Sequence, residues 1–448
     1  MMLSCMIRMK TYRQRTVLWL STFMVILSVG WSIGSAQATC ILVNTTDDEL
    51  NGDGDCSLRE AIEATNTDAV TDACVAGSGA DNICVPEGVY TLTQGTPLAI
   101  TSDLSLLGAG ADLTFIQAAE EPGTAAFRVL TITSMRTVYI ADVTIRHGNT
   151  SADSESRDGG CILNSGSLSL VNCAVRACTS AGDGGAIRNF TGSLTLRTCE
   201  VSDNATQNNG AAIFNGGGAA GGTLTLIEST ITRNTSNTNA GGVYNNSGSD
   251  PCIFLNSMIS ENMSLFDGGG VVNFSGAIEV INSTVNNNMA ERGGGGGIDN
   301  EGKLSITNST IINNDAIFGS GVNNHDSGIT VLTDNSMVIN NTALLRGGGI
   351  DNAGTLSLTT STVSNNTAGE GGGIKNREFG TAVLIDGVVT ANGATTEGGG
   401  LHNDGTIVLI DSLLTENAAP DSPDCHGIVV SVGETQIGNE AGCDVRRP

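Results

Sequence analysis

The chain has 448 residues and carries 46 acidic against 20 basic side chains, a formal net charge of −26. This balance argues against nucleic acids and anionic membrane surfaces as partners, because a strongly acidic protein repels polyanions. Aromatic residues make up only 4 % of the chain, so we expect a core of aliphatic side chains.

Residues 1–38 have the pattern of a signal peptide. Basic residues lie between positions 8 and 15, an apolar run covers 17–29, and residues 36–38 read Ala-Gln-Ala, which fits a cleavage site. We therefore expect the mature chain to begin at Thr39, to be secreted or held at the cell surface, and to keep no transmembrane anchor. A retained anchor is the alternative, but the apolar run is short for a membrane span.

The next segment, 39–82, is expected to form an N-terminal cap. Ser57 and Glu60 make a Ser-x-x-Glu capping box, which predicts a helix that runs through Asn66. Such a helix would cover the open strand edges of the coils that follow, which otherwise invite aggregation. We favour this structural role over a catalytic one.

The cap also contains the spacing of a calcium loop. Glu49, Asn51, Asp53 and Glu60 occupy positions one, three, five and twelve, with Gly54 at position six. Glutamate replaces the usual aspartate at position one, and no helix clearly precedes the loop. We therefore favour an acidic turn over a structural calcium site, and we expect no other metal or cofactor.

Short alternating segments begin after the cap. Residues 83–158 contain several of them, including 89–92, 104–108 and 138–145, and predict about three irregular coils. Across 159–420 the chain repeats one phrase: two or three small residues, mostly glycine, an aliphatic residue, any residue, then asparagine. The closing asparagines recur at intervals of 24 to 30 residues.

A fixed period of this length indicates a solenoid whose units bury their apolar faces against one another. Each period holds three short segments with period-two alternation, the pattern of strands, and no stretch has helical spacing. We therefore predict an all-β fold, a single-stranded parallel β-helix with a short N-terminal capping helix.

The closing asparagines are expected to point inward and to form a structural ladder, because buried amides can bond to the coils above and below. The first ladder comprises Asn164, Asn189, Asn215, Asn245, Asn273, Asn300, Asn324, Asn352, Asn376 and Asn403. A second ladder comprises Asn204, Asn234, Asn262, Asn288, Asn314, Asn341, Asn366, Asn392 and Asn417, with Cys178 in its first coil.

The residue before each asparagine of the first ladder should point outward and form a solvated surface column. Asp299 and Asp351 lie two coils apart in it, about 10 Å, but no neighbour in the column supplies a general acid, so we expect no catalytic residue there. Phe214 and Tyr244 offer rings for stacking on a sugar. The column reads Leu163, Arg188, Phe214, Tyr244, Val272, Asp299, Asn323, Asp351, Lys375, His402.

The cysteines indicate disulfides, as is usual in exported proteins. Cys74 and Cys84 are close in sequence, as are Cys425 and Cys443, and the last pair lies in a C-terminal cap, 421–448. Cys173 and Cys199 occupy the same place in adjacent coils, so their Cα atoms should lie within bonding reach. The odd number of cysteines left after cleavage leaves one thiol free. Metal ligation is the weaker alternative, because no Cys-x-x-Cys or histidine pairing accompanies them.

Two motifs resemble known families. Residues 56–62 read Cys-Ser-Leu-Arg-Glu-Ala-Ile, similar to the CSLREA motif of bacterial exported β-helix proteins. Residues 184–187 read Gly-Gly-Ala-Ile, which resembles the repeat of chlamydial polymorphic outer-membrane proteins, although the phenylalanine of that family's Phe-x-x-Asn element is replaced here. The resemblance implies a right-handed helix of the pectin-lyase-like superfamily and a bacterial source.

These expectations favour an exported protein that acts by adhesion or glycan binding without catalysis, with a polysaccharide or a cell-surface ligand as its partner. A polysaccharide lyase or glycoside hydrolase of the same superfamily is the first alternative, and a structural surface-layer component is the second. A cluster of acidic and basic residues on one face would favour an enzyme, and the sequence does not show one.

Overall fold

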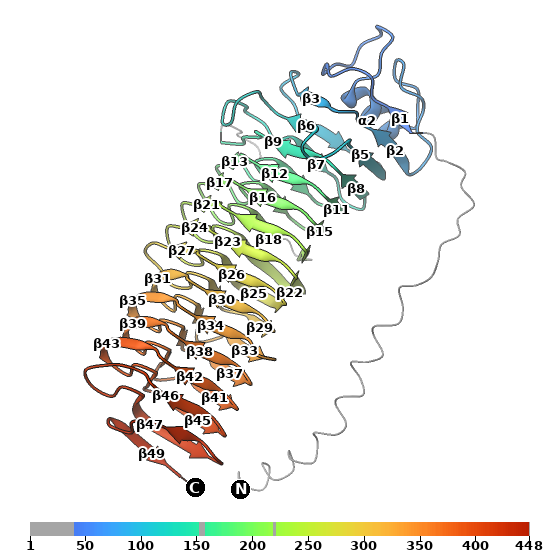
Figure 1. Cartoon of the computed structure of the whole chain (residues 1–448). Coiled ribbons are helices and arrows are strands. Elements are labelled where there is room, and N and C mark those ends of the chain that lie inside the picture. The colour runs from blue at the N-terminus through green and yellow to red at the C-terminus, as the bar shows by residue number, and fades with distance from the viewer. Residues whose placement is uncertain (1–39, 152–156, 218–220, 448) are drawn as a thin grey trace, which may run out of the picture. The chain divides into compact units, whose positions relative to one another are not determined.

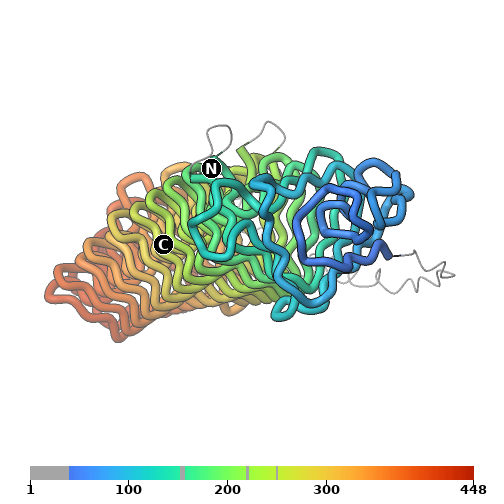
Figure 2. The backbone as a smooth tube through the Cα atoms, turned by 90° about the horizontal axis from the view of Figure 1, so that it is seen from above, coloured from blue at the N-terminus to red at the C-terminus, as the bar shows by residue number. Residues whose placement is uncertain are grey.

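The computed structural model describes residues 40–151, 157–217 and 221–447, which form a parallel β-helix with a cap before its first coil (Figure 1). The predicted signal peptide lies outside the described residues. Strands of successive coils pair in parallel and in register, so that Ile298 lies beside Val322 and Asn300 beside Asn324. The tube through the Cα atoms shows the coils one behind another from the blue end to the red (Figure 2). The predicted parallel β-helix is confirmed.

The largest sheet has 26 strands and takes two segments from most coils. Its Ile-x-Asn segments are β4 (Leu98–Ile100), β7 (Leu130–Ile132), β10 (Ile162–Asn164), β14 (Ile187–Asn189), β18 (Ile213–Gly216), β28 (Ile298–Asn300), β32 (Val322–Asn324), β36 (Ile350–Asn352), β40 (Ile374–Asn376) and β44 (Leu401–Asn403). Its Leu-x-Leu segments are β2 (Asp81–Cys84), β5 (Leu104–Leu107), β8 (Thr137–Ala141), β11 (Ser167–Val171), β15 (Ser193–Arg197), β19 (Thr223–Ile227), β29 (Lys303–Thr307), β33 (Ile329–Thr333), β37 (Thr355–Thr359), β41 (Thr381–Ile385) and β45 (Thr406–Ile410). The remaining members are β1 (Ile41–Leu42), β22 (Val243–Leu255), β25 (Val271–Ile281), β47 (Cys425–Val432) and β49 (Cys443–Arg446).

A second sheet carries the Thr-Ile segments and has 14 strands. They are β3 (Gly88–Thr91), β6 (Thr114–Gln117), β9 (Thr144–Arg146), β12 (Ala174–Arg176), β16 (Glu200–Ser202), β20 (Thr230–Thr232), β23 (Met258–Ser260), β26 (Thr284–Asn286), β30 (Thr310–Ile312), β34 (Met337–Ile339), β38 (Thr362–Ser364), β42 (Val388–Thr390), β46 (Leu413–Thr415) and β48 (Gln436–Ile437).

The structure adds a third sheet of nine strands that the sequence did not indicate. Its strands follow the second ladder and are only two to five residues long, too short for alternation to be recognised. They are β13 (Thr179–Ser180), β17 (Ala205–Thr206), β21 (Thr235–Ser236), β24 (Met263–Ser264), β27 (Met289–Ala290), β31 (Asp315–Phe318), β35 (Thr342–Arg346), β39 (Thr367–Glu370) and β43 (Gly393–Glu397).

Left-handed residues turn the chain at the corners between strands. Asn308 (φ 47°) and Asn313 (φ 56°) mark two corners of one coil, and asparagine tolerates this conformation better than most residues. The corner before the Ile-x-Asn segment uses glycine, as Gly295 (φ 65°) shows. A Cβ at Gly295 would lie 2.6 Å from the backbone nitrogen of Asp299, so the repeated glycines permit close backbone approach.

Two chains of asparagine hydrogen bonds run through the interior. In the first, each Nδ2 donates to Oδ1 in the next coil, as Asn300 does to Asn324 at 2.8 Å. In the second, the backbone N and Nδ2 both donate to the next Oδ1, at 2.9 and 3.0 Å from Asn288 to Asn314. Each of these buried amides therefore has a partner and avoids the desolvation penalty of an unpaired polar group.

The cap is built on α2 (Leu58–Thr67). The Ser57 Oγ accepts from the Glu60 backbone N at 3.2 Å, and the Glu60 Oε2 accepts from the Ser57 N at 3.0 Å, which is the reciprocal capping box. Leu58 and Ile62 bury the inner face of the helix. Within the described residues, no helix combines the length and apolar character that a membrane span requires.

Cys74 and Cys84 are both in disulfides, but not with each other. Cys84 pairs with Cys40, and Cys74 pairs with Cys56. Strand β1 lies beside β2 with Leu42 opposite Cys84, so the N-terminal strand brings a cysteine to Cys84 that sequence proximity could not reveal. The two bonds tie the strand and the helix of the cap together.

Two further disulfides connect residues near the ends of the regular coils. Cys161 pairs with Cys178, and Cys425 pairs with Cys443. Cys178 takes the place of the first asparagine of the second ladder, and its Sγ is bonded to Cys161. At the other end the second ladder stops at Asp424, whose Oδ1 accepts from the backbone N and Nδ2 of Asn417.

The expectation of a disulfide between Cys173 and Cys199 is wrong, because both are buried free thiols, as is Cys252. The Cys173 N donates to the Cys199 Sγ (3.4 Å), and the Cys199 N donates to the Ser229 Oγ (3.1 Å). The two cysteines thus occupy positions that serine fills in later coils. At these positions the side chain accepts a hydrogen bond from a backbone N of the preceding coil. Three thiols are free in the described chain, not one.

Candidate functional site

The residues before the first-ladder asparagines form a column on the Ile-x-Asn segments, called here the central column. The expectation that this column is a solvated face is wrong. Each member from Arg188 to His402 is buried, and Asp299 and Asp351 are only 2 % and 0 % exposed. The side chains stack in register along the sheet and are covered by residues on both sides, which period-two alternation within one strand cannot indicate.

Two flanking sets of residues cover the central column. The pre-glycine column stands just before the left-handed corner of each coil: Asp158, Asp183, Asn209, Asn239, Asp267, Gly294, Phe318, Arg346, Glu370 and Glu397. The post-ladder column stands just after each asparagine of the first ladder: Ser165, Phe190, Gly216, Asn246, Phe274, Glu301, His325, Ala353, Arg377 and Asp404. Together the three columns bring acidic, basic and aromatic side chains from ten coils to one face.

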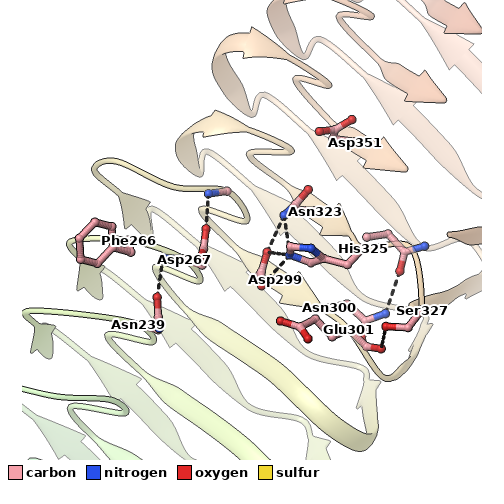
Figure 3. A network of polar contacts seen from close by, with 12 residues as sticks. Asn239, Phe266, Asp267, Asp299, Asn300, Glu301, Asn323, His325, Ser327 and Asp351 are labelled. Atoms are coloured by element: carbon pink, nitrogen blue, oxygen red, sulfur yellow. Dashed lines mark hydrogen bonds and ion pairs between the residues drawn. The ribbon is translucent and has the colours of Figure 1, made fainter. Parts of the chain in front are cut away.

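A polar cluster surrounds Asp299 on β28 (Figure 3). His325 Nε2 lies 2.9 and 3.1 Å from the two carboxylate oxygens of Asp299. Asn323 Nδ2 donates to Asp299 Oδ1 at 2.6 Å and lies 3.0 Å from His325 Nε2. Asp267 comes from the neighbouring corner and accepts from the Gly294 backbone N at 2.8 Å. The clustered acidic and basic residues that the sequence did not show are therefore present.

The electrostatics of this cluster favour a charged imidazole beside carboxyl groups that hold protons more tightly than usual. The hydrogen bond that His325 donates to Asp299 raises the pKa of His325. Burial raises the pKa of Asp267, and the charge of Asp299 adds to this shift. Burial likewise raises the pKa of Glu301. The carboxyl groups of Asp267 and Glu301 therefore keep their protons to a higher pH than free side chains do.

Asp351, two coils farther on, is held by two arginines. Arg377 donates from Nε to Oδ1 (3.0 Å) and from Nη2 to Oδ2 (2.6 Å), and Arg346 donates from Nε to Oδ2 (2.9 Å). Arg377 also donates to the Asn323 Oδ1 at 3.2 Å, which links this clamp to the Asp299 cluster. With both oxygens engaged by guanidinium groups, Asp351 is a structural anchor.

Aromatic rings occupy the same face in the preceding coils. Arg188 lies over the Phe214 ring, 4.0 Å from its centroid, and Phe214 stacks on Tyr244 with centroids 4.8 Å apart. Tyr244 in turn stacks on Phe274 at 6.1 Å. Burial raises the pKa of Tyr244, with smaller contributions from carboxylates that include Glu301, so the stack and the polar cluster adjoin.

The structure changes which rings can meet a ligand. Phe214 and Tyr244 are 4 % and 9 % exposed, so the expectation that they present their faces to a sugar is wrong. Phe274 and Phe190 in the post-ladder column are exposed, as is Phe266 beside Asp267. In Figure 3, Phe266 points away from the Asp299 cluster. The position after each ladder asparagine was the overlooked signal in the sequence.

A surface cavity of about 590 Å³ lies elsewhere, over the 14-stranded sheet. Its lining includes Cys173, Cys199, Glu200 and Arg233. Arg233 is about half exposed and pairs with Asp203 at 2.8 Å. Exposed ion pairs of this kind are common and contribute little, and the thiols are buried, so we place the functional site on the post-ladder column instead.

In the acidic loop of the cap, the carboxylate at position twelve of the calcium-loop spacing already accepts hydrogen bonds. Glu60 uses Oε1 to accept from the Asn51 N (3.0 Å) and Oε2 for the capping box, so its oxygens serve the helix. Two overlapping sets of carboxylates gather here, Glu49 with Asp53 and Asp55, and Asp55 with Glu60 and Asp72. The Asn51 side chain donates to Glu49. A structural calcium here stays a prediction.

Comparisons with known proteins give no family for this chain. No family model matches it, and no curated protein matches it. Among solved structures it is similar to the A-module of a mannuronan C-5 epimerase from Azotobacter vinelandii, with 14 % identity, 88 % of this chain and 96 % of that chain covered, and a TM-score of 0.43. A likeness this remote assigns neither a site nor an activity. The resemblance to CSLREA and chlamydial repeat proteins stays a prediction.

Proposed function

We propose that this chain is an exported β-helix protein that binds a neutral polysaccharide or a similar cell-surface glycan without cleaving it. The binding site lies where Phe274, Glu301 and His325 follow one another in the post-ladder column. The observation that carries the proposal is the exposed Phe274 ring. This ring stacks on buried Tyr244 and precedes Glu301 and His325 in the post-ladder column.

The chemistry of these side chains fits a sugar. An aromatic ring offers a face for the apolar side of a pyranose, and nearby imidazole and carboxylate groups exchange hydrogen bonds with its hydroxyls. The coils repeat about every 4.8 Å, so a linear glycan could meet equivalent positions in several coils. The net charge of −26 disfavours polyanionic glycans. Binding at a cell surface would make the protein an adhesin.

Export is the second part of the proposal. The structure contains four disulfides, and disulfides persist mainly in oxidising compartments such as the periplasm or the exterior. Fractionation of the producing cells, followed by N-terminal sequencing of the mature chain, tests this part. A chain that stays in the cytoplasm with residues 1–38 attached would contradict it.

The binding proposal is tested by electrophoresis of the mature protein through gels that contain neutral polysaccharides. The parent should be retarded by at least one of them, and Phe274→Ala should be retarded less. Met337→Ala is the matched control, because Met337 is a 40 % exposed apolar side chain on β34 of the 14-stranded sheet. Equal retardation of the parent and Phe274→Ala, or no retardation in any gel, would contradict the proposal.

Cleavage of the glycan is the second candidate, and one observation favours it. Asp267, whose pKa is raised, stands beside Asp299 and its His325 partner, and acid–base cleavage needs one carboxyl group that holds its proton. Asp299 is nearly inaccessible, which favours binding alone. New reducing ends that form with the parent and not with Asp299→Asn would establish the second candidate.

A further inference from the structure

We propose that Glu397, His402 and His426 form a binding site for a divalent transition-metal ion, with Zn²⁺ as its expected occupant. The geometry points to this because one ligand atom from each of the three side chains lies within 4.8 Å of the others. The site departs from the sequence-based expectation of no metal centre outside the cap loop, and it is separate from the proposed glycan site.

The chain brings the three side chains together from three strands. His402 on β44 and His426 on β47 are directly opposite in register, and their rings lie 4.5 Å apart, centroid to centroid. Glu397 ends β43 and reaches the histidines across the corner at Gly398. A Cβ at Gly398 would lie 2.7 Å from the Cβ of His402, so glycine allows the carboxylate and the imidazole to approach.

The distances suit a small cation. His426 Nδ1 lies 3.3 Å from Glu397 Oε2, and His402 Nδ1 lies 3.7 Å from Glu397 Oε1. In a tetrahedral zinc site with bonds of about 2.0–2.1 Å, neighbouring ligand atoms lie about 3.3 Å apart. Two imidazoles and one carboxylate are a donor set that favours Zn²⁺ and similar ions over Ca²⁺ or Mg²⁺.

A buried atom without a partner is the independent observation. The side chain of His402 is only 4 % exposed, and its Nδ1 has no hydrogen-bond partner. Leaving a buried polar atom unpaired is costly, and native structures usually give such an atom a role. This Nδ1 is the atom of His402 that faces Glu397.

The surroundings of His402 hold it in the form that a metal requires. His402 Nε2 lies 3.1 Å from Asp404 Oδ1, so Asp404 accepts the Nε2 proton and leaves the lone pair on Nδ1. A carboxylate behind a ligating imidazole is the usual outer partner in zinc sites. Lys375 Nζ holds the other oxygen of Asp404 at 2.8 Å.

The local charge also favours a divalent ion. Lys375 pairs with Glu370 at 3.1 Å as well as with Asp404. With Glu397 beside the histidines, this part of the face carries three carboxylates against one ammonium group. His426 and Glu397 have side chains that are 36 % and 35 % exposed, so an ion can enter from solvent and keep a water as a further ligand.

The test uses the mature protein after treatment with a chelator and dialysis. Addition of ZnCl₂ should load about one ion per chain, measured by elemental analysis of the dialysed protein, and should raise Tm, because binding stabilises the folded state. CaCl₂ at the same concentration should not displace the bound Zn²⁺. If Co²⁺ is loaded instead, the visible spectrum of the Co²⁺ ion should change, because imidazole nitrogens coordinate the ion.

Two variants test the site, and a third is the control. His426→Asn, at a partly exposed position, should weaken Zn²⁺ binding by about tenfold or more, and Asp404→Asn by about 10–100-fold. His147→Gln is the matched control, because His147 is far from this site in the chain and its Nδ1 lies 3.0 Å from the Ala119 carbonyl oxygen, and it should leave Zn²⁺ affinity unchanged. Absence of Zn²⁺ binding, unchanged affinity in His426→Asn, or loss of binding in His147→Gln alone would overturn the proposal.

Discussion

At the scale of single residues, the structure separates stacked polar side chains that support the fold from those that can meet a ligand. The ladder asparagines belong to the first group, since the side-chain amide of each one donates a hydrogen bond to the next coil, as Asn300 does. Asp351 joins them through its arginine clamp. His325 and Phe274 belong to the second group, because each touches a buried partner and keeps an exposed side.

Replacement of a ladder asparagine should destabilise the protein. Asn300→Ala removes a bonded amide and takes from the Nδ2 of Asn273 the nearer of its two acceptors (2.7 Å), so we expect the free energy of unfolding to fall by about 1–3 kcal/mol. Asn237→Ala at an exposed position is the control and should change it by less than about 0.5 kcal/mol. Chemical denaturation measures both, and equal losses would contradict the ladder's structural role.

The contact between His325 and Asp299 should make stability depend on pH. The pKa of His325 is raised in the folded state, so its stabilisation is fully present below the unfolded pKa of about 6.5 and is lost as the pH rises through the folded value. The Tm difference between the parent and His325→Gln should therefore be larger near pH 5.5 than near pH 8.5. Asp267 and Glu301, the neighbouring titrating groups, are present in both proteins. A difference that grows with rising pH would contradict this assignment.

At the scale of elements, the sequence predicted what depends on local periodicity. Glycine corners, alternating strands and the Ser57–Glu60 capping box follow from spacing along the chain, and the structure contains each of them. The burial of Asp299 and Asp351 did not follow, because it depends on side chains from adjacent coils and from two flanking columns. The pairing of His402 with His426 was hidden because Gly427 stands where the repeat would have asparagine.

The cysteine assignments predict thiol reactivity. The mature chain should contain three free thiols, Cys173, Cys199 and Cys252, and burial raises the pKa of Cys252 to about 12. A thiol reagent should therefore label the native protein very little, since the thiolate is the reactive form. After denaturation without a reductant, three thiols per chain should react. One reactive thiol would support the Cys173–Cys199 disulfide instead.

The cap should be required for solubility. A chain that begins at Asp81 lacks β1 and α2, which exposes the edge of β2, and exposed edges promote association. Because Cys84 would lose Cys40, the truncated chain should carry Cys84→Ser so that thiol oxidation does not confuse the result. We expect aggregates or oligomers in light scattering. A monodisperse monomer whose circular dichroism spectrum matches that of the parent would show that the cap is not required for solubility.

At the scale of the whole molecule, the parallel coils place equivalent side chains at regular intervals along one face. Aromatic residues are scarce in the chain, at 4 %, yet Phe190, Phe214, Tyr244, Phe274 and Phe318 all belong to the three columns of this face. The polar cluster at Asp299 continues the same face. This concentration of rare rings beside paired polar groups is the reason for proposing a glycan-binding surface.

The most direct test of that claim is a calorimetric titration of the parent, Phe274→Ala and Met337→Ala with the oligosaccharide of the polysaccharide that retards the parent. Loss of the Phe274 ring should raise the Kd of Phe274→Ala by about tenfold, since aromatic stacking contributes about 0.5–1.5 kcal/mol beyond burial. The affinity of Met337→Ala should equal that of the parent. The same affinity in all three proteins would contradict a glycan site on the post-ladder column.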